Sequence, residues 1–187
     1  MDSESLHTDL QNLLAYKDSR VRIGTYCVKE DLLPELIQLC QPESGVSHQA
    51  CWSLEQSYLL FEADCYLHLG EICALFPMKI NHSAMRSLLK IGTLLCKSYY
   101  SKREHPIKEI LTLEMRNQLV EGAFNELLTA YGKTANLAFA TNTLFLLGTE
   151  FDWIHPAMPA IIEEHIVNPE SKGYKSVGGK TLKRLND

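Results

Sequence analysis

The hydrophobic residues of this chain recur at helical spacing along almost its whole length. Leu6, Leu10, Leu13 and Leu14 form the first apolar stripe, within a helix predicted over about residues 5–16. No segment alternates apolar and polar residues as a half-buried strand does, so the sequence predicts an all-α fold. The remaining predicted helices are a short one ending near residue 28 and those over about residues 31–40, 48–61, 64–76, 82–99, 113–131, 134–148, 156–165 and 174–185.

A short segment centred on a small residue occurs three times. The segments around Ala50 and Ala84 align without gaps at an offset of 34 residues, and a third copy surrounds Ala138, 54 residues further on. An offset near 34 residues is typical of helical repeats. A small central residue lets neighbouring helices approach closely, whereas leucine there would cost about 1–3 kcal/mol through overpacking.

These repeats predict a short right-handed α-α superhelix of about four stacked helical hairpins, each burying its apolar face against its neighbours. The predicted domain is a single one over residues 1–187, with N-terminal capping helices over about 5–28 and repeats over about 31–185. The second interval is longer because it holds an extra segment over residues 99–114, whose polar part at residues 101–106 interrupts the period.

Length and composition are those of an ordinary folded domain, with 187 residues, 45% hydrophobic and 22% charged. The net charge of -5 disfavours nucleic acid as a partner, because that binding depends on neutralising phosphates. Neither an apolar N-terminal core nor a run of about 18 apolar residues is found in the sequence. We therefore expect a cytoplasmic protein that is neither secreted nor inserted in a membrane.

Six cysteines lie in apolar, helical stretches without a CxxC pair. This usage predicts reduced, buried thiols and not the disulfide framework of a small secreted domain. Cys65, His68 and Cys73 come nearest to a metal-ligand cluster, but they lack the paired short spacings of zinc sites. The sequence therefore predicts core packing for them, and it predicts no metal and no cofactor.

Three features resemble HEAT/armadillo-type α-α superhelix proteins: the alternating helix pairs, the alanine-centred helices, and the sequence LFLLGTEFDWIHP over residues 144–156. More narrowly, the chain resembles short Bacteroidetes proteins without an assigned role, some of which are labelled adenylosuccinate lyase. The resemblance covers nearly the whole chain and implies the superhelical fold. Of the Ser-Ser-x-Met-Pro-x-Lys-x-Asn loop of the lyase family, only Met158-Pro159 has a match here.

The best candidate binding residues are predicted to lie opposite Ala50 on its helix. At 100° per residue, His48, Trp52 and Glu55 fall on that face. The aligned residues of the second copy include His82 and Arg86. Because the inner helices of solenoids line a concave binding face, these five residues form the candidate patch. A structural alternative has Trp52 in the core against the neighbouring repeat and Arg86 paired with Glu55.

The segment Asp152-Trp153-Ile-His155-Pro156 carries residue types that suit a pocket. A structural account is sufficient, in which Asp152 caps the next turn, Pro156 begins a helix and Trp153 fills the gap between the last two hairpins. The Gly-Lys-Thr triplet at 179–181 is not a phosphate-binding loop, because Tyr174 stands where the upstream glycine belongs and no strand precedes it.

The C-terminal segment is basic on an otherwise acidic chain. Such a run is typical of a solvated helix face, and the alternative is a patch for an acidic partner. Its cationic residues are Lys172, Lys175, Lys180, Lys183 and Arg184.

The sequence carries no catalytic, metal or nucleotide signature, which favours a non-enzymatic function. We expect a protein that binds another protein or a peptide on the concave face of its repeats. The resemblance leaves two alternatives open. One is a nucleic-acid enzyme similar to the HEAT-like alkylpurine DNA glycosylases, which are longer and more basic. The other is a lyase, which needs a general acid and a general base. The oligomeric state does not follow from the sequence.

Overall fold

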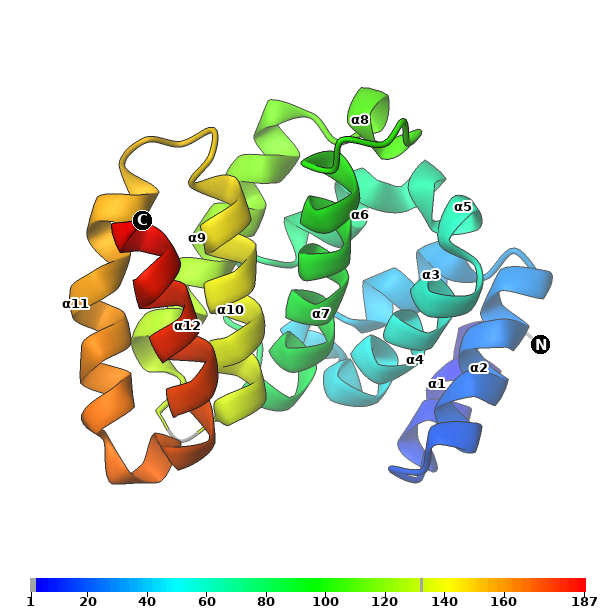
Figure 1. The fold of residues 1–187 in the computed structure, drawn as a ribbon. Coiled ribbons are helices and arrows are strands. Elements are labelled where there is room, and N and C mark those ends of the chain that lie inside the picture. The colour runs from blue at the N-terminus through cyan, green and yellow to red at the C-terminus, as the bar shows by residue number, and fades with distance from the viewer. Residues whose placement is uncertain (1–2, 132) are drawn as a thin grey trace. The chain divides into compact units, whose positions relative to one another are not determined.

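The structure is a computed structural model that describes residues 3–131 and 133–187. Every regular element in these ranges is a helix, which confirms the all-α prediction (Figure 1). The elements are α1 (Ser3–Gln11), α2 (Lys17–Lys29), α3 (Leu33–Leu39), η1 (Pro42–Ser44), α4 (Ser47–Leu60), α5 (Glu62–Cys65), η2 (Tyr66–His68), α6 (Leu69–Ala74), α7 (His82–Tyr99), α8 (Ile107–Ile110), α9 (Leu113–Thr129), α10 (Thr134–Leu147), α11 (Ile154–Val167), η3 (Pro169–Tyr174) and α12 (Lys175–Asn186).

From α7 onward the long helices begin and end within two residues of their predicted boundaries. Two earlier predictions were wrong. The first helix ends at Gln11, well before residue 16, and the helix predicted over 64–76 is divided into α5, η2 and α6. The helix is interrupted between η2 and α6 because the backbone of His68 leaves the helical region, with φ -114° and ψ 13°, after one 3-10 turn.

The chain divides into two compact units, Met1–Ile91 and Gly92–Asp187, so α7 begins in the first unit and ends in the second. The predicted single domain stays a prediction, because neighbouring repeats of a solenoid also contact one another more than distant ones. In the first unit α4 is central: α2 and α3 pack against it, and α1 contacts both α3 and α4.

Helices α2 and α4 meet almost backbone to backbone at Gly24. A Cβ atom at this position would lie 2.5 Å from the carbonyl oxygen of Ser53. The hydroxyl of Ser57 donates to the carbonyl of Gly24 at 3.0 Å. Only glycine permits this approach, which brings the outer residues of α2 within reach of those of α4.

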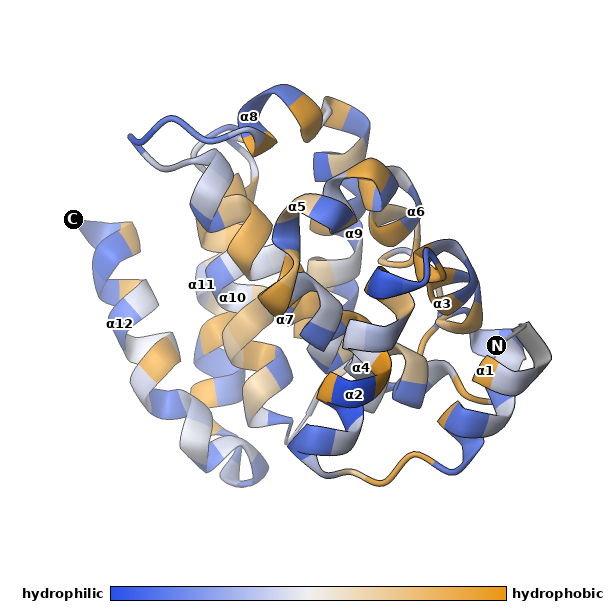
Figure 2. Cartoon of the chain, turned by 90° about the vertical axis from the view of Figure 1, so that its right-hand side faces the viewer, coloured by the Kyte–Doolittle hydropathy of each residue, from blue (hydrophilic) through white to orange (hydrophobic). Residues whose placement is uncertain are grey.

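In the second unit α9 pairs with α10 and α11 pairs with α12. Figure 2 shows that α10 is largely hydrophobic, whereas α12 is mostly hydrophilic. Helix α12 approaches α11 at Gly178, where a Cβ atom would lie 3.0 Å from the side chains of Ile162 and Ile166. Helix α12 packs on α10 as well as on α11, and its lysine side chains are exposed.

The three predicted small-residue centres differ in the structure. Ala50 and Ala84 are completely buried, as expected. Ala138 is only half-buried, and Ala140 takes the buried place in α10. The third copy is therefore out of register by two residues. A buried hydrogen bond from Asn136 of α10 to Glu126 of α9 accounts for this, because it turns Asn136 and, one turn later, Ala140 toward α9.

All six cysteines are free and buried, which confirms that part of the prediction. Burial raises the pKa of Cys27, Cys65 and Cys73 to about 12, so these thiols stay neutral near pH 7. His68 contacts Glu71, with Nδ1 3.1 Å from Oε2. Within the described residues no His, Cys, Asp and Glu side chains are grouped to hold a metal ion, and no helix has the length and apolarity needed to cross a membrane.

Candidate functional site

Helix α4 carries a stripe of functional side chains one turn apart. The rings of His48 and Trp52 lie edge to face, with centroids 5.0 Å apart. Arg20 of α2 places its guanidinium carbon 4.7 Å from the centre of the Trp52 ring. A cation over an aromatic face stabilises by about 0.5–2 kcal/mol, depending on desolvation. Trp52 is therefore held half-buried between an imidazole and a guanidinium.

One turn along α4, Glu55 lies at the centre of a buried hydrogen-bond network. Its Oε1 accepts from Lys90 Nζ at 2.6 Å, and its Oε2 accepts from Ser87 Oγ at 2.6 Å and Arg86 Nη2 at 3.3 Å. The side chain of Glu55 is only 4% exposed, against 32% for Arg86 and 30% for Lys90. The carboxylate is thus enclosed, while the cations that neutralise it still reach water.

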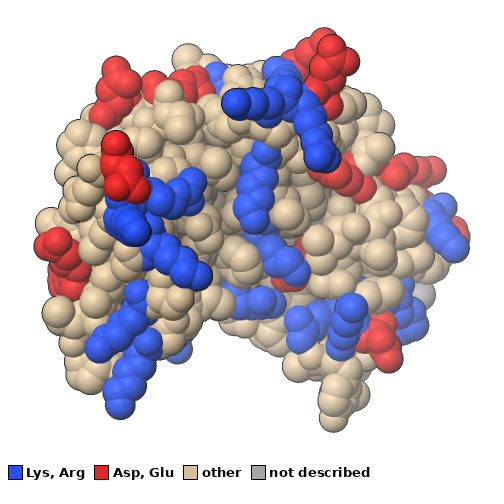
Figure 3. Space-filling model, in the orientation of Figure 1, with Lys and Arg blue, Asp and Glu red and all other residues tan. Residues whose placement is uncertain are grey.

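His82, Arg86 and Lys90 follow one another at one-turn spacing along α7. Together with the stripe on α4 and with Arg20 they form what we name the basic strip, whose cationic groups outnumber its single carboxylate by three to one. Figure 3 shows Lys and Arg side chains over α7 and beside α4. The members of the strip are Arg20, His48, Trp52, Glu55, His82, Arg86 and Lys90.

Contacts join the residues of the predicted patch in two pairs, His48 with Trp52 and Glu55 with Arg86, whereas it is the spacing on α7 that places His82 with Arg86. One residue of the patch has a different environment from that expected. Glu55 was placed on an exposed face and is buried, because Arg86, Ser87 and Lys90 of α7 cover it. The pairing of Arg86 with Glu55, which the structural alternative proposed, is observed. Trp52 is not in the core, since it packs against Arg20 at the edge of α4.

Sequence reasoning missed Arg20, Ser87 and Lys90. Lys90 had a signal, because it lies four residues after Arg86 and hence on the same face of the helix. Arg20 had none: its position over Trp52 depends on the close approach of α2 and α4 at Gly24.

The second unit contains a charge cluster with the opposite arrangement. Arg116 is buried, and its Nη2 donates to Glu150 Oε1 at 2.8 Å. Its guanidinium carbon lies 4.6 Å from the centre of the Tyr99 ring. Tyr100 donates to Glu150 Oε2 at 2.6 Å. Partial burial opposes the charge of Glu150, but these hydrogen bonds outweigh it and lower the pKa of Glu150. The described hydrogen bonds of Arg116, Tyr100 and Glu150 are made within the unit, so the cluster stabilises the fold.

The segment after α10 does not form the predicted plug. Trp153 is 57% exposed and stacks on Phe124 of α9, with ring centroids 5.1 Å apart. His155 lies 2.8 Å from the carbonyl of Phe145 and stacks on its ring. Arg184 covers that ring at 3.8 Å. The histidine and the arginine therefore fasten α11 and α12 to α10 through Phe145.

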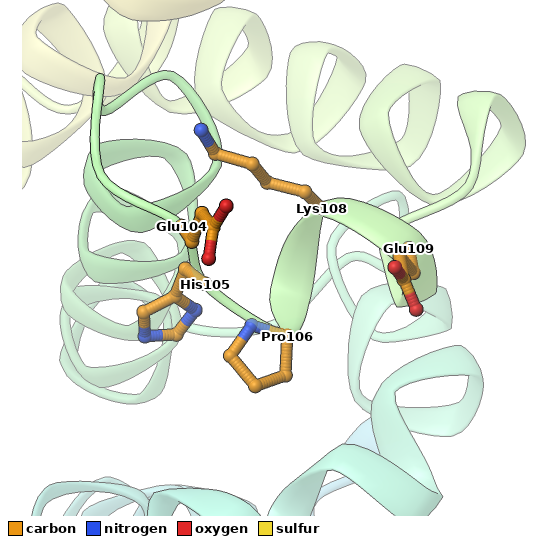
Figure 4. Close-up of a pocket in the computed structure, with 5 residues that line it drawn as sticks. All are labelled: Glu104, His105, Pro106, Lys108 and Glu109. Carbon is orange, nitrogen blue, oxygen red and sulfur yellow. The ribbon is translucent and has the colours of Figure 1, made fainter.

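A shallow hollow of about 590 Å³ lies at the polar segment before α8, lined by Glu104, His105, Pro106, Lys108 and Glu109 (Figure 4). Figure 4 shows Lys108 extending over Glu104 while Glu109 lies apart from the other four. Lys108 donates to the carbonyl of Ser101 at 2.6 Å, and His105 accepts from the amide of Ile107 at 3.3 Å. Both side chains hold the loop together, so this hollow is not the candidate site.

All cationic side chains of the predicted basic C-terminal segment are exposed to solvent, and they lie on η3 and α12. Figure 3 shows a concentration of Lys and Arg over α12. Only Arg184 has a described side-chain contact, the one with Phe145. This matches the solvated helix face that the sequence favoured.

Comparisons with protein-family models, with curated proteins and with solved structures find no match to this chain. The candidate function therefore rests on the geometry of the basic strip.

Proposed function

We propose that this chain is a non-enzymatic binding protein that recognises an acidic segment of a protein or peptide on the basic strip of its first unit. The observation that carries the proposal is the excess of cations there. Arg86 and Lys90 contact the single carboxylate of the strip, that of Glu55, while Arg20 lies over Trp52 and has no described contact with it. Three cations against one carboxylate leave two positive charges uncompensated within the strip. An anionic ligand would neutralise the positive charges that Glu55 leaves uncompensated.

The geometry of the strip also suits a peptide ligand. Trp52 is half-buried and held in place by Arg20 and His48, so a ligand side chain can pack on it without first ordering it. Tryptophan and arginine are the residues that most often dominate binding energy at protein interfaces. The partly exposed cations of the strip would select carboxylates by charge and accelerate encounter.

The repeat architecture is part of the proposal. Consecutive helices pair as α9 with α10 and α11 with α12, and close approach at Gly178 supports dense stacking in the second unit. We infer that these pairs are HEAT/armadillo-like hairpins of a right-handed superhelix, in which the basic strip would lie on the concave face. This architecture would give an extended surface for a peptide.

The test is binding of labelled peptides to the purified full chain. An acidic peptide with one aromatic residue should bind more tightly than its lysine-substituted counterpart. The double variant Trp52→Ala/Arg86→Ala should weaken binding by about tenfold or more. Trp153→Ala/Lys183→Ala is the matched control, because it also removes one tryptophan and one exposed cation but lies in the second unit. Equal loss in both variants would contradict the proposal.

The alternatives are outcomes of the same experiment. A duplex DNA probe that binds the chain with a steep salt dependence, and fails to bind Trp52→Ala/Arg86→Ala, would replace the peptide by nucleic acid. Turnover of adenylosuccinate by the purified protein near neutral pH would support the lyase label and overturn the non-enzymatic assignment.

A further inference from the structure

One long stretch of the chain has no cationic residue apart from histidine. Residues 30–78 contain no lysine or arginine and eight aspartates or glutamates. This stretch forms α3, η1, α4, α5, η2 and α6 of the first unit. Of its acids, only Glu55 belongs to the basic strip. The others therefore concentrate negative charge on the part of the unit that surrounds α3, and Figure 3 shows acidic side chains beside α5.

Three hollows lie along α3 in this acidic region. They have volumes of about 280, 310 and 270 Å³. Pro34 lines the first two, and Gln38 and Gln41 line the last two, so the hollows adjoin one another along the helix. Every acidic or basic side chain that lines them, histidine apart, is a carboxylate: Asp31, Glu35, Glu43, Asp64 and Glu71.

The walls between these carboxylates are apolar. Leu33 and Leu67 line the first hollow, and Ile37, Leu75 and Met78 line the second. Leu67 is 87% exposed, so its side chain is accessible to a ligand at the first hollow. An apolar floor with a charged rim is typical of surfaces that receive a helix by its hydrophobic face.

Glu35 differs from the other carboxylates that line the hollows. It lines the third hollow, and its Oε2 is buried without a hydrogen-bond partner in the structure. Because this oxygen has almost no exposed surface, it is not a contact for a docked ligand, and the rim carboxylates and the apolar walls are the surfaces that a ligand can reach.

We propose that the grooves along α3 bind a lysine-rich amphipathic helix of a partner protein. Its apolar side chains would occupy the hollows beside Ile37 and Leu67, and its ammonium groups would meet Asp31, Asp64 and Glu71 on the rim. Charge complementarity with the carboxylates requires a positively charged partner helix. The apolar walls require that this helix also has a hydrophobic face. The site is separate from the basic strip and does not depend on its function.

The experiment measures binding of a labelled leucine-lysine peptide with leucines at helical spacing to the full chain by fluorescence anisotropy. Two control peptides carry glutamate in place of lysine and serine in place of leucine. Asp64→Lys/Glu71→Lys should weaken binding of the leucine-lysine peptide by about tenfold or more, because the lysines of the peptide would then meet positive charges at positions 64 and 71. Glu114→Lys/Glu163→Lys makes the same change in net charge on exposed acids of the second unit, and it should leave the affinity within about twofold.

If both double variants weaken binding equally, the effect comes from the net charge of the chain, and the proposed site along α3 is wrong. Equal binding of the serine-containing peptide would overturn the apolar anchoring. Sedimentation of the wild-type chain tests a different occupant: an oligomer that dissociates in Asp64→Lys/Glu71→Lys would make a second copy of the chain the ligand, and overturn the assignment to a partner. A monomeric wild type, with the leucine-lysine peptide bound and only the α3 variant impaired, supports the proposal.

Discussion

The two units bury opposite charges. In the first, the acid Glu55 is enclosed and its partners Arg86 and Lys90 reach solvent. In the second, the base Arg116 is enclosed and its partner Glu150 is more exposed. A buried charge is tolerated only when it is paired, and it is the enclosed member whose partners matter most. The two clusters therefore differ in which residue can be substituted with little loss of stability.

The difference also separates stability from binding. The exposed cations of the first unit exceed what Glu55 needs, so the cluster keeps positive charge for a ligand. In the second unit, Glu150 accepts from Arg116 and Tyr100, and Arg116 also covers the Tyr99 ring. That cluster is complete without a ligand, and we expect its variants to change stability and leave peptide binding intact.

The largest effect is expected when the buried acid loses both cations. Arg86→Met/Lys90→Met leaves Glu55 with Ser87 as its remaining described partner, which should lower the free energy of unfolding by about 3 kcal/mol. Adding Glu55→Gln should recover most of this loss. Chemical denaturation followed by circular dichroism measures both. A loss no larger than that of the exposed control Lys175→Met/Lys183→Met would show that Glu55 is solvated.

A slightly smaller effect is expected from Gly24→Ala. The new methyl group would meet the backbone oxygen of Ser53, which cannot rotate away, so we expect a loss of about 2–3 kcal/mol. Trp52 reports on the first unit, because a Trp153→Phe background leaves it as the sole tryptophan. Its fluorescence should show an earlier unfolding midpoint. An unchanged midpoint would mean that α2 and α4 can separate without cost.

Glu150→Gln is expected to cost about 1 kcal/mol at neutral pH, because Arg116 keeps other contacts and solvent screens Glu150. The pKa of Glu150 is lowered in the folded state, so its contribution is present above the ordinary glutamate pKa and is lost as pH falls through the lower folded value. The free energies of unfolding of the wild type and the variant should therefore converge as the pH falls. A gap that persists below that pKa would contradict the ion pair.

The smallest effects come from two neighbouring glycines of α12. Gly178→Ala should cost about 1 kcal/mol, because its methyl group meets side-chain atoms of Ile162 and Ile166 at 3.0 Å, and side chains shift more readily than backbone. Gly179→Ala meets nothing within 4 Å and should gain about 0.5–1 kcal/mol through helix propensity. Thermal unfolding distinguishes them. Equal shifts would show that α12 does not pack on α11 through Gly178.

The sequence by itself determined the helices. Apolar residues at helical spacing fixed α7, α9, α10, α11 and α12 to within two residues, because periodicity is a local property that survives packing. It also determined that the cysteines are buried and that His48, Trp52 and Glu55 share one side of α4. It did not determine the register of the third small-residue segment, where a buried contact between Asn136 and Glu126 decides which alanine faces inward.

Only the tertiary structure decided the environment of the candidate residues. Periodicity places Glu55 on a face, but the cations that enclose it come from a helix that begins more than twenty residues later. Arg20 reaches Trp52 because Gly24 lets α2 approach α4, a contact without any local sequence signal. Side-chain spacing within a helix is set by backbone geometry, whereas contacts between helices depend on the shapes of both surfaces.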